Sequence, residues 1–296
     1  MQFGKVDDPS RVDFSLPKDA VDTARVLKPF KNDEHPEIYV GCAKWNRADL
    51  KGFYPRGTKD ELAYYSTQFN CIELNATFYN MPTKKQVEIW RKKTPPGFRF
   101  FPKLTNSISH YKRLIGVKSL VNEFCDAIMA FEEKLGMAFL QLHDNFAPKD
   151  FERLQTMLQE FPKGMPLAVE VRNEKWFSDK ENFNQYTQLL EDLGMANIIV
   201  DTAGRRDMLH MRLTSPEAFI RYVGANHSSD KDRLDEWVKR IKKWKTAGLQ
   251  KLYFFVHQNV ELESPLLAAH FIQELNKALK MDLHLPGKAT GGLFDQ

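Results

Sequence analysis

Eight short apolar runs rich in β-branched and aromatic residues recur along this chain of 296 residues, at 38–42, 71–75, 98–101, 137–142, 167–171, 197–201, 219–223 and 252–256. Amphipathic stretches with apolar residues three and four positions apart lie between them, at 84–93, 120–135, 151–161, 183–193 and 234–246. Repeated strand–helix units form parallel sheets covered by helices, and this length suits closure into one barrel. We therefore predict an α/β fold, a single (β/α)8 barrel of the TIM type. An open doubly wound sheet is the alternative.

The connection after the sixth run breaks this pattern. Residues 202–217 contain Gly204 and the pair Arg205-Arg206 but show no helical period. We expect the outer helix between the sixth and seventh strands to be missing or replaced.

Proline spacing and polarity set the expected boundaries. Residues 1–36 are polar and carry four prolines, which predicts an N-terminal extension that is wrapped on the domain surface or partly disordered. The barrel domain is expected at 37–281, and a C-terminal tail at 282–296.

Charge and cysteine content exclude several classes of protein. The net charge of +4 is spread along the chain, so it names no partner. Cys42, Cys71 and Cys125 are odd in number and lack metal-ligand spacing, which argues against a disulfide framework or a structural zinc site. The sequence has no apolar run of membrane-spanning length and no secretory signal at its start. We predict a cytoplasmic protein without a membrane partner, and the sequence leaves its oligomeric state open.

Polar side chains gather where the predicted strands end. In α/β barrels the functional groups lie at these carboxyl ends, and residues two apart on a strand share a face. Charges there are costly unless they are paired or used, so they form either a self-satisfied ion network or a polar substrate site. The strand-end residues are Glu73, Asn75, Lys103, Gln141, His143, Glu170, Arg172, Asp201, Arg221 and His257.

A divalent metal is a weaker possibility at the same place. Imidazole and carboxylate groups from different strands can coordinate such an ion, but the neighbouring lysine and arginines would compete for the carboxylates. The candidate ligands are Glu73, His143, Glu170, Asp201 and His257.

Aromatic residues crowd the loops after these strands. Such rings cap a barrel core or serve as stacking platforms for a sugar or a base. His110, beyond the third strand, is a candidate for the rim. No dinucleotide fingerprint, Walker-type phosphate loop or serine-hydrolase elbow is present in the sequence. The aromatic residues are Trp45, Phe53, Tyr54, Phe78, Tyr79, Trp176 and Phe177.

Several segments together form a recognisable pattern: GCAKW at 41–45, FYP at 53–55, FNCIELNATFY at 69–79, TPPGFRF at 94–100 and AVEVR at 168–172, with Trp90, Lys103, Ser109, His110 and Trp176. This pattern resembles the YecE-like family, which is catalogued as a domain of unknown function. The resemblance covers about residues 38–279, and its most specific part is the glutamate–asparagine–phenylalanine–tyrosine element within 69–79.

The resemblance implies a TIM-type barrel but no established reaction. It also places Asp201 and Arg221 on polar strand-end positions of the family. The chain departs from the family pattern at Lys44, where glycine is usual, and at His257-Gln258, where two asparagines are usual. The second departure bears on any shared role of the eighth strand.

Our leading hypothesis is an enzyme that acts on a small polar substrate, sugar-like or phosphorylated, by acid/base chemistry of the hydrolase or isomerase type. In it Glu73 and Glu170 are acid and base, and basic side chains hold negative charge. The expected catalytic residues are Glu73, Lys103, Glu170 and Asp201. The expected substrate-binding residues are Trp45, Asn75, Tyr79, His110, Gln141, His143, Arg172, Trp176, Arg221 and His257.

Two alternatives remain open. A nucleic-acid-binding or metal-dependent phosphodiesterase barrel is suggested by the basic pairs Lys112-Arg113 and Arg205-Arg206 together with the rim aromatics. A barrel that binds a ligand without turning it over is the other. The cofactor is unknown, with a divalent metal as the one specific candidate.

Overall fold

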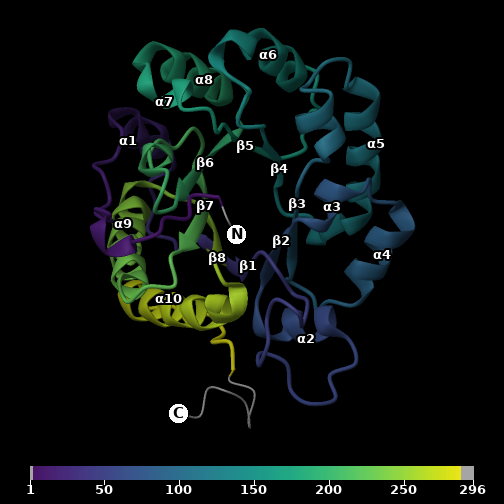
Figure 1. The fold of residues 1–296 in the computed structure, drawn as a ribbon, viewed down its shortest axis with the longest axis vertical. Coiled ribbons are helices and arrows are strands. Elements are labelled where there is room, and N and C mark those ends of the chain that lie inside the picture. The colour runs from purple at the N-terminus through teal and green to yellow at the C-terminus, as the bar shows by residue number, and fades with distance from the viewer. Residues whose placement is uncertain (1–2, 288–296) are drawn as a thin grey trace.

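The computed structural model describes residues 3–287 and shows an α/β fold whose parallel strands are surrounded by helices (Figure 1). The strands form a curled six-stranded sheet in the order β1-β8-β7-β6-β5-β4 and a separate pair, β2-β3. Residues 1–2 of the predicted extension and 288–296 of the predicted tail lie outside the described residues. The strands are β1 Glu37–Cys42, β2 Cys71–Leu74, β3 Arg99–Pro102, β4 Ala138–Gln141, β5 Leu167–Glu170, β6 Ala196–Asp201, β7 Glu217–Gly224 and β8 Lys251–Gln258.

The two sheets meet at two seams that differ from a regular ladder. Between β3 and β4, the Gly136 amide donates to the Phe100 carbonyl at 2.9 Å. Between β1 and β2, the Asn70 side chain accepts from the Val40 amide at 3.0 Å and donates to the Ile38 carbonyl at 2.8 Å. The structure therefore shows a curled parallel half-barrel with a strand pair beside it, which is a coarser result than the closed eight-stranded barrel predicted from the sequence.

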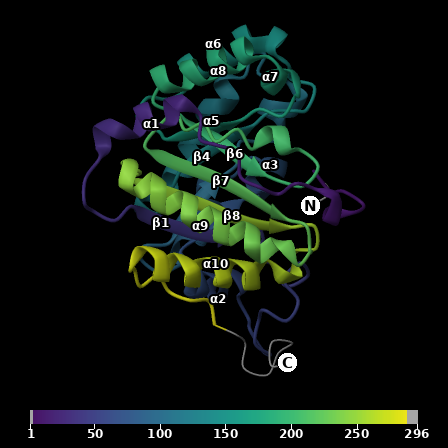
Figure 2. The ribbon, with the colours of Figure 1, turned by 90° about the vertical axis from the view of Figure 1, so that its left-hand side faces the viewer.

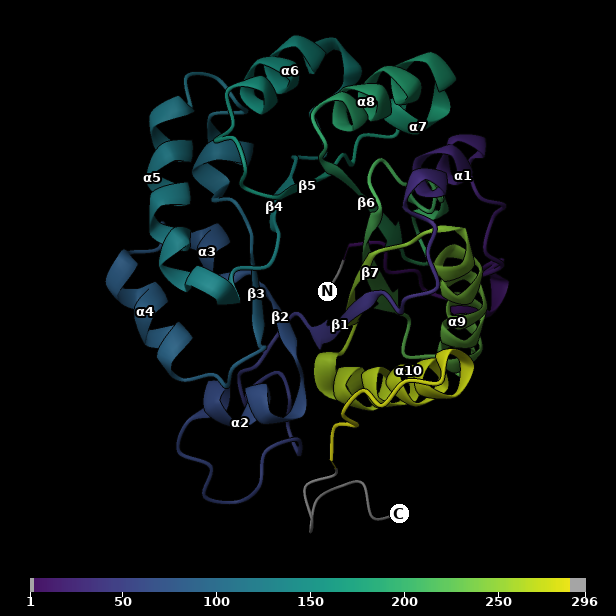
Figure 3. The ribbon, with the colours of Figure 1, turned by 180° about the vertical axis from the view of Figure 1, so that it is seen from behind.

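Helices cover the outside of the strands on all sides (Figures 1 and 3). Within residues 3–287, no helix is long and apolar enough to cross a membrane. The α-helices are α1 Val21–Leu27, α2 Glu61–Gln68, α3 Ala76–Tyr79, α4 Lys84–Lys92, α5 Lys118–Ile128, α6 Phe151–Gln159, α7 Lys175–Ser178, α8 Lys180–Asp192, α9 Ser229–Ala247 and α10 Ser264–Leu279.

The N-terminal segment supplies a helix where the strand–helix pattern breaks. Between β6 and β7 the chain forms only a short 3-10 helix, Arg206–Met208. Helix α1 lies outside this connection, between α8 and α9 (Figures 1 and 3). Thr23 of α1 donates to the Met211 carbonyl at 2.9 Å and accepts from the Leu213 amide at 3.1 Å. The helix that takes the place of the missing one thus comes from a distant part of the sequence.

A cluster of aromatic side chains fills the space enclosed by the strands. Phe101 of β3 lies 5.0 Å from Phe255 of β8 and 6.0 Å from Phe219 of β7, measured between ring centroids. Phe139 of β4 lies 5.5 Å from Phe219. Because side chains two residues apart share a face, the polar residue that follows each of these rings on its strand lies above this cluster. Those residues build the candidate site.

Candidate functional site

Ten of the predicted site residues line one cavity of about 1050 Å³ at the carboxyl ends of the strands. The carboxyl ends of parallel strands converge, so residues far apart in the sequence meet here. Aromatic residues and the segment at the N-terminus complete the wall. The ten are Trp45, Glu73, Asn75, Tyr79, Lys103, His110, Gln141, Arg172, Arg221 and His257.

Arg221 of β7 joins two buried carboxylates at the floor of the cavity. Its Nε and Nη2 each donate to the Glu73 carboxylate at 2.9 Å. Its Nη1 donates to Glu170 Oε2 at 2.6 Å. His257 and Asn75 also donate to Glu73, at 2.9 and 2.8 Å, because an ionised carboxylate can only accept. The three charged side chains at the centre are almost fully buried, so their pairing offsets a large cost of desolvation.

Three basic side chains converge on one neutral oxygen above this network. The amide oxygen of Gln141, at the end of β4, accepts from Arg172 Nη2 at 2.7 Å, Lys103 Nζ at 3.0 Å and Arg221 Nη1 at 3.3 Å. Arg172 also donates from Nε to Glu170 Oε1 at 2.5 Å. An amide oxygen carries no net charge and has two lone pairs, so these three cations are incompletely neutralised.

Both buried carboxyl groups are held in the ionised form. Burial acts to raise the pKa of Glu170, but the charges of Arg221 and Arg172 outweigh it and lower this pKa to about 2. Burial opposes Arg221 and His257 in the same way at Glu73, whose pKa is held well below its ordinary value. Near neutral pH neither group has a proton to donate.

Lys103 is a buried group whose pKa lies near neutral pH. Burial, with the nearby charges of Arg221 and Arg172, lowers the pKa of Lys103 to about 7. The ring of Phe78 lies 3.9 Å from its Nζ and Phe139 lies 6.0 Å below. A lysine placed between aromatic rings and two arginines can give or take a proton at physiological pH.

His110 lies at the rim on a single π-helical turn, Ser107–Tyr111, a local geometry that is frequent at functional sites. Its ring contacts Phe78 and His143, with centroids 4.9 and 5.1 Å away. Burial and the charge of Lys103 lower the pKa of His110 to about 4, which keeps it neutral near pH 7. It is a neutral polar group beside the cationic floor.

Comparison with known proteins places this chain in a family. The sequence model described as "Protein of unknown function DUF72" matches residues 39–290. The chain belongs to this family. It is 26% identical over 264 residues to the UPF0759 protein YecE of Escherichia coli K12, covering 82% of this chain and 94% of YecE. It is 29% identical over 150 residues to the UPF0759 protein YunF of Bacillus subtilis 168, covering 48% of this chain and 52% of YunF.

Two solved DUF72 structures share the fold. A protein from Enterococcus faecalis V583 aligns with a TM-score of 0.66 at 19% identity, over 84% of this chain and 99% of that chain. A protein from Thermotoga maritima MSB8 aligns with a TM-score of 0.63 at 24% identity, over 83% of this chain and 100% of that chain. The resemblance noted in the sequence is thereby confirmed, and these names establish no activity or substrate for the DUF72 chain.

Asp201 lies apart from the cavity. Val200 belongs to the inner cluster of β6, so the next residue faces the outer helices. There Asp201 accepts from Arg233 at 2.8 Å and from Trp237 Nε1 at 2.8 Å, and it also pairs with Arg206. Its carboxylate joins β6 to α9.

The remaining predicted residues lie behind or beside the cavity wall. Glu170 does not line the cavity but pairs with two arginines that do. His143 packs on His110 at the rim. Trp176 is fully buried and donates from Nε1 to the Phe146 carbonyl at 2.8 Å.

Phe3 is a site residue that the sequence did not reveal. It lines the cavity, and the guanidinium carbon of Arg172 lies 3.8 Å from the centre of its ring. Residue 3 lies 169 positions from Arg172, and neither helical nor strand periodicity links them. The only available signal was the polar, proline-rich extension itself.

The predicted metal ligands do not gather into one set. Within residues 3–287, no group of three His, Cys, Asp or Glu side chains is placed to hold a metal ion. Glu73 and His257 are neighbours, but the Arg221 guanidinium fills the space between Glu73 and Glu170. Asp201 faces the outer helices. The donor set therefore does not fit a divalent cation in this arrangement.

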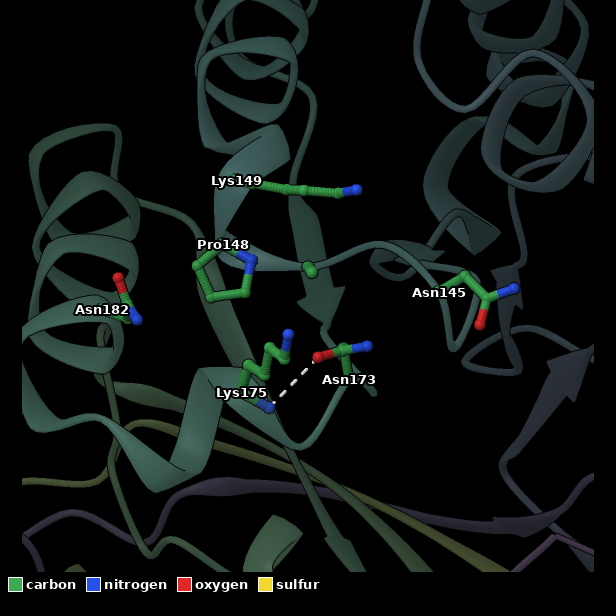
Figure 4. Close-up of a pocket in the computed structure, with 7 residues that line it drawn as sticks. Asn145, Pro148, Lys149, Asn173, Lys175 and Asn182 are labelled. Atoms are coloured by element: carbon green, nitrogen blue, oxygen red, sulfur yellow. Dashed lines mark hydrogen bonds between the residues drawn. The ribbon is translucent and has the colours of Figure 1, made fainter.

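A smaller hollow of about 290 Å³, which we call the rim hollow, lies between the segments that follow β4 and β5 (Figure 4). Asn173, next to Arg172, accepts from the Lys175 backbone amide at 3.1 Å there. Two exposed lysines and three asparagines give the hollow a basic, hydrogen-bonding character without a carboxylate. Its polar lining residues are Asn145, Lys149, Asn173, Lys175 and Asn182.

Proposed function

We propose that this DUF72 protein is an enzyme acting on a small polar anion, sugar-like or phosphorylated, at the mouth of the strands. The observation that carries the proposal is the convergence of Lys103, Arg172 and Arg221 on the single amide oxygen of Gln141. A substrate phosphate or carboxylate would accept the hydrogen bonds that this oxygen cannot satisfy and would neutralise the excess charge.

The nearby carboxylates support this charge balance. Glu73 and Glu170 neutralise much of Arg221 from below. A third carboxylate near the cluster, that of Asp144, lies 3.9 Å from Arg172 Nη1, and its side chain is 62% exposed, so water screens it. Two more carboxylates line the cavity: Asp49 pairs with Lys44, and Glu261 lies 3.9 Å from His257 Nδ1. The cavity side of the cluster is left with positive character.

We assign proton transfer to Lys103 and charge stabilisation to the arginines. A group with a pKa of about 7 can act as acid and as base at neutral pH. Glu73 and Glu170, which the sequence suggested as acid and base, are ionised and engaged, and in the proposal they orient Arg221 and Arg172. In the proposal, Asp201 has a structural role, because its carboxylate pairs with Arg233.

The test is proton exchange on a substrate panel. We would incubate the full-length protein in D2O with sugar phosphates and hydroxy- and keto-acids, and follow deuterium incorporation by NMR. We expect exchange or turnover of one chemical class, abolished in Lys103→Met and reduced at least tenfold in Glu170→Gln and Glu73→Gln. Lys44→Met is the matched control because Lys44 lines the same cavity, where it pairs with Asp49.

Saturable binding of a panel anion without exchange or turnover would instead favour a non-catalytic ligand-binding protein. Exchange that persists in Lys103→Met would remove the assigned role of Lys103.

The rim hollow favours one alternative, a protein that binds nucleic acid. Lys149 and Lys175 are exposed and line this hollow, where they could contact the phosphates of a phosphodiester chain. Affinity for an oligonucleotide that falls steeply with salt and is weakened in Lys149→Gln/Lys175→Gln would support this alternative. A flat salt response would count against it.

We also propose that the two sheets close as one eight-stranded barrel within residues 37–281. The Asn70 side chain at one seam and the Gly136–Phe100 hydrogen bond at the other support closure. Slow amide hydrogen exchange at Val40 and Gly136 is the expected result.

A further inference from the structure

The N-terminal arm, residues 3–36, runs from the outer helices, where it forms α1, to the cavity at the carboxyl ends of the strands, which Phe3 lines. The family model begins at residue 39, so the arm lies outside it. Its contacts show how Phe3 reaches the cavity.

The tip of the arm is docked on the loop after β6. The Gly204 amide donates to the Gly4 carbonyl at 2.7 Å. Gly4 has a φ of +70°, and a Cβ on this residue would lie 2.2 Å from Thr202 Oγ1. A glycine is therefore needed for the backbone to approach this closely.

Further contacts hold the rest of the arm against the same side of the molecule. The Phe14 ring lies 4.3 Å from the guanidinium carbon of Arg233. Asp19 pairs with Arg240 and Lys243, each at 2.6 Å, and accepts from Trp244 Nε1 at 3.0 Å. Together with α1, whose Thr23 bonds were described above, these contacts fix the path of the arm (Figure 2).

Docking of the tip brings the Phe3 ring onto Arg172. The ring packs on the inner aromatic cluster, lines the cavity and lies 3.8 Å from the guanidinium carbon. It covers a group whose donors are directed to Glu170 and Gln141. A ring on this surface excludes water, which strengthens the charge interactions of Arg172.

We propose that Phe3 is a positioning residue of the site and that the arm forms one wall of the anion-binding cavity. Phe3 holds the Arg172 guanidinium in the plane that binds Glu170 and Gln141, and it shields this group from solvent. The part concerning the anion rests on the proposed function, whereas the shielding of Arg172 does not.

The test measures how fast phenylglyoxal modifies each arginine, by peptide mass spectrometry on the full-length protein. We expect modification of Arg172 to be about fivefold faster in Phe3→Ala, which corresponds to loss of a cation–π contact of about 1 kcal/mol. Phe3→Tyr should restore the wild-type rate, and Phe3→Leu should not, because an aliphatic side chain fills space without a π face. Arg47, 5.4 Å from the Tyr54 ring, is the internal reference.

A second variant removes the docking without changing the ring. Gly4→Ala should also expose Arg172, whereas Gly57→Ala should not, because Gly57 has a similar φ of +86° but nothing within 4 Å of an added Cβ. Equal rates at Arg172 in wild type, Phe3→Ala and Gly4→Ala would overturn the proposal. So would a Phe3→Tyr rate as fast as Phe3→Ala, or an equal rise at Arg47 in both variants.

Added sulfate separates the two proposals. Protection of wild-type Arg172 by sulfate, weakened in Phe3→Ala, is expected if the arm is a wall of the anion site. No protection of the wild type would refute the anion site, and the rates without sulfate would still decide whether Phe3 shields Arg172.

Discussion

At the scale of single residues, the buried cluster depends on Arg221. Its side chain is 1% exposed and lies between two carboxylates that are fully buried. Without Arg221, among the described residues Glu73 would keep only His257 and Asn75 as partners and Glu170 only Arg172. Loss of a partner from a buried ion pair costs several kcal/mol. Arg221 therefore serves the stability of the fold as well as the charge of the cavity.

We expect Arg221→Met to lower the free energy of unfolding by about 3–5 kcal/mol, because it removes one partner from buried ion pairs. Urea unfolding followed by circular dichroism measures this. The control is Arg11→Met, since the Arg11–Asp8 pair is largely exposed and should contribute less than about 1 kcal/mol. Equal effects of the two substitutions would contradict the assigned importance of Arg221.

The pKa of Lys103 predicts how anion binding depends on pH. Burial and two arginines lower it to about 7, so the cation that attracts an anion is present below this pH and is lost above it. Sulfate, which keeps its charge throughout, should bind about tenfold more weakly at pH 8 than at pH 6, as the protonated fraction falls from about 90% to about 10%. Calorimetric titration at both pH values checks this.

Lys103→Met should bind sulfate weakly with little pH dependence, whereas Lys44→Met should behave as the wild type. A pH dependence that survives in Lys103→Met would assign the titration to another group.

The lowered pKa of Lys103 also makes the stability of the fold depend on pH. Its pKa is lower in the folded than in the unfolded protein, so between about pH 7 and about pH 10 the unfolded chain binds more protons. The free energy of unfolding therefore receives a contribution from Lys103 that rises with pH across this window. Urea midpoints in wild type compared with Lys103→Met should show this rise only in the wild type. An identical pH profile in both would contradict it.

The positions of site residues could be predicted from the sequence where the alternation of side chains along a strand fixes them. They could not be predicted where packing between distant segments fixes them. Glu73, Lys103, Gln141 and Arg221 each lie two positions after a residue of the inner cluster, and the structure brings them to one cavity. Asp201 is the last residue of β6 and directly follows Val200, an inner residue, so strand alternation directs it outward. Phe3 reaches Arg172 through the path of the arm, which local patterns do not encode.

At the scale of elements, α1 takes the place of an absent helix between β6 and β7. The sequence predicted the gap from the lack of helical period at 202–217, but not which segment would fill it. Long-range contacts make that choice, among them the bonds of Thr23 to Met211 and Leu213. The seam between β1 and β2 also could not be predicted from local patterns. There the Asn70 side chain provides hydrogen bonds that a strand pattern would assign to the backbone.

We expect Thr23→Val to lower the free energy of unfolding by about 1–3 kcal/mol, because it leaves a buried carbonyl and amide without their partner while preserving side-chain shape. Thr67→Val is the matched control, since Thr67 is exposed and bonds only within its own helix. Its effect should stay within about 0.5 kcal/mol. Equal effects in urea unfolding would show that α1 docking does not depend on Thr23.

At the scale of the whole molecule, strands far apart in sequence deliver both the aromatic cluster and the cations above it. The apolar floor of Phe139 and its neighbours lowers the local dielectric, so charges at the mouth interact strongly. Ionised carboxylates balance the lower part of the cluster, and the cavity side remains cationic. The fold thus concentrates positive charge where a small anion can enter.

The most direct test of this claim is sulfate binding, by calorimetry at pH 6, to the wild type and to Gln141→Glu. This nearly isosteric change places a carboxylate where Lys103, Arg172 and Arg221 converge. We expect the wild type to bind sulfate at one site and Gln141→Glu to lose that binding while its free energy of unfolding rises, because the built-in carboxylate takes the place of the anion. Absence of sulfate binding by the wild type, or equal binding by the variant, would contradict an anion site at the mouth of the strands.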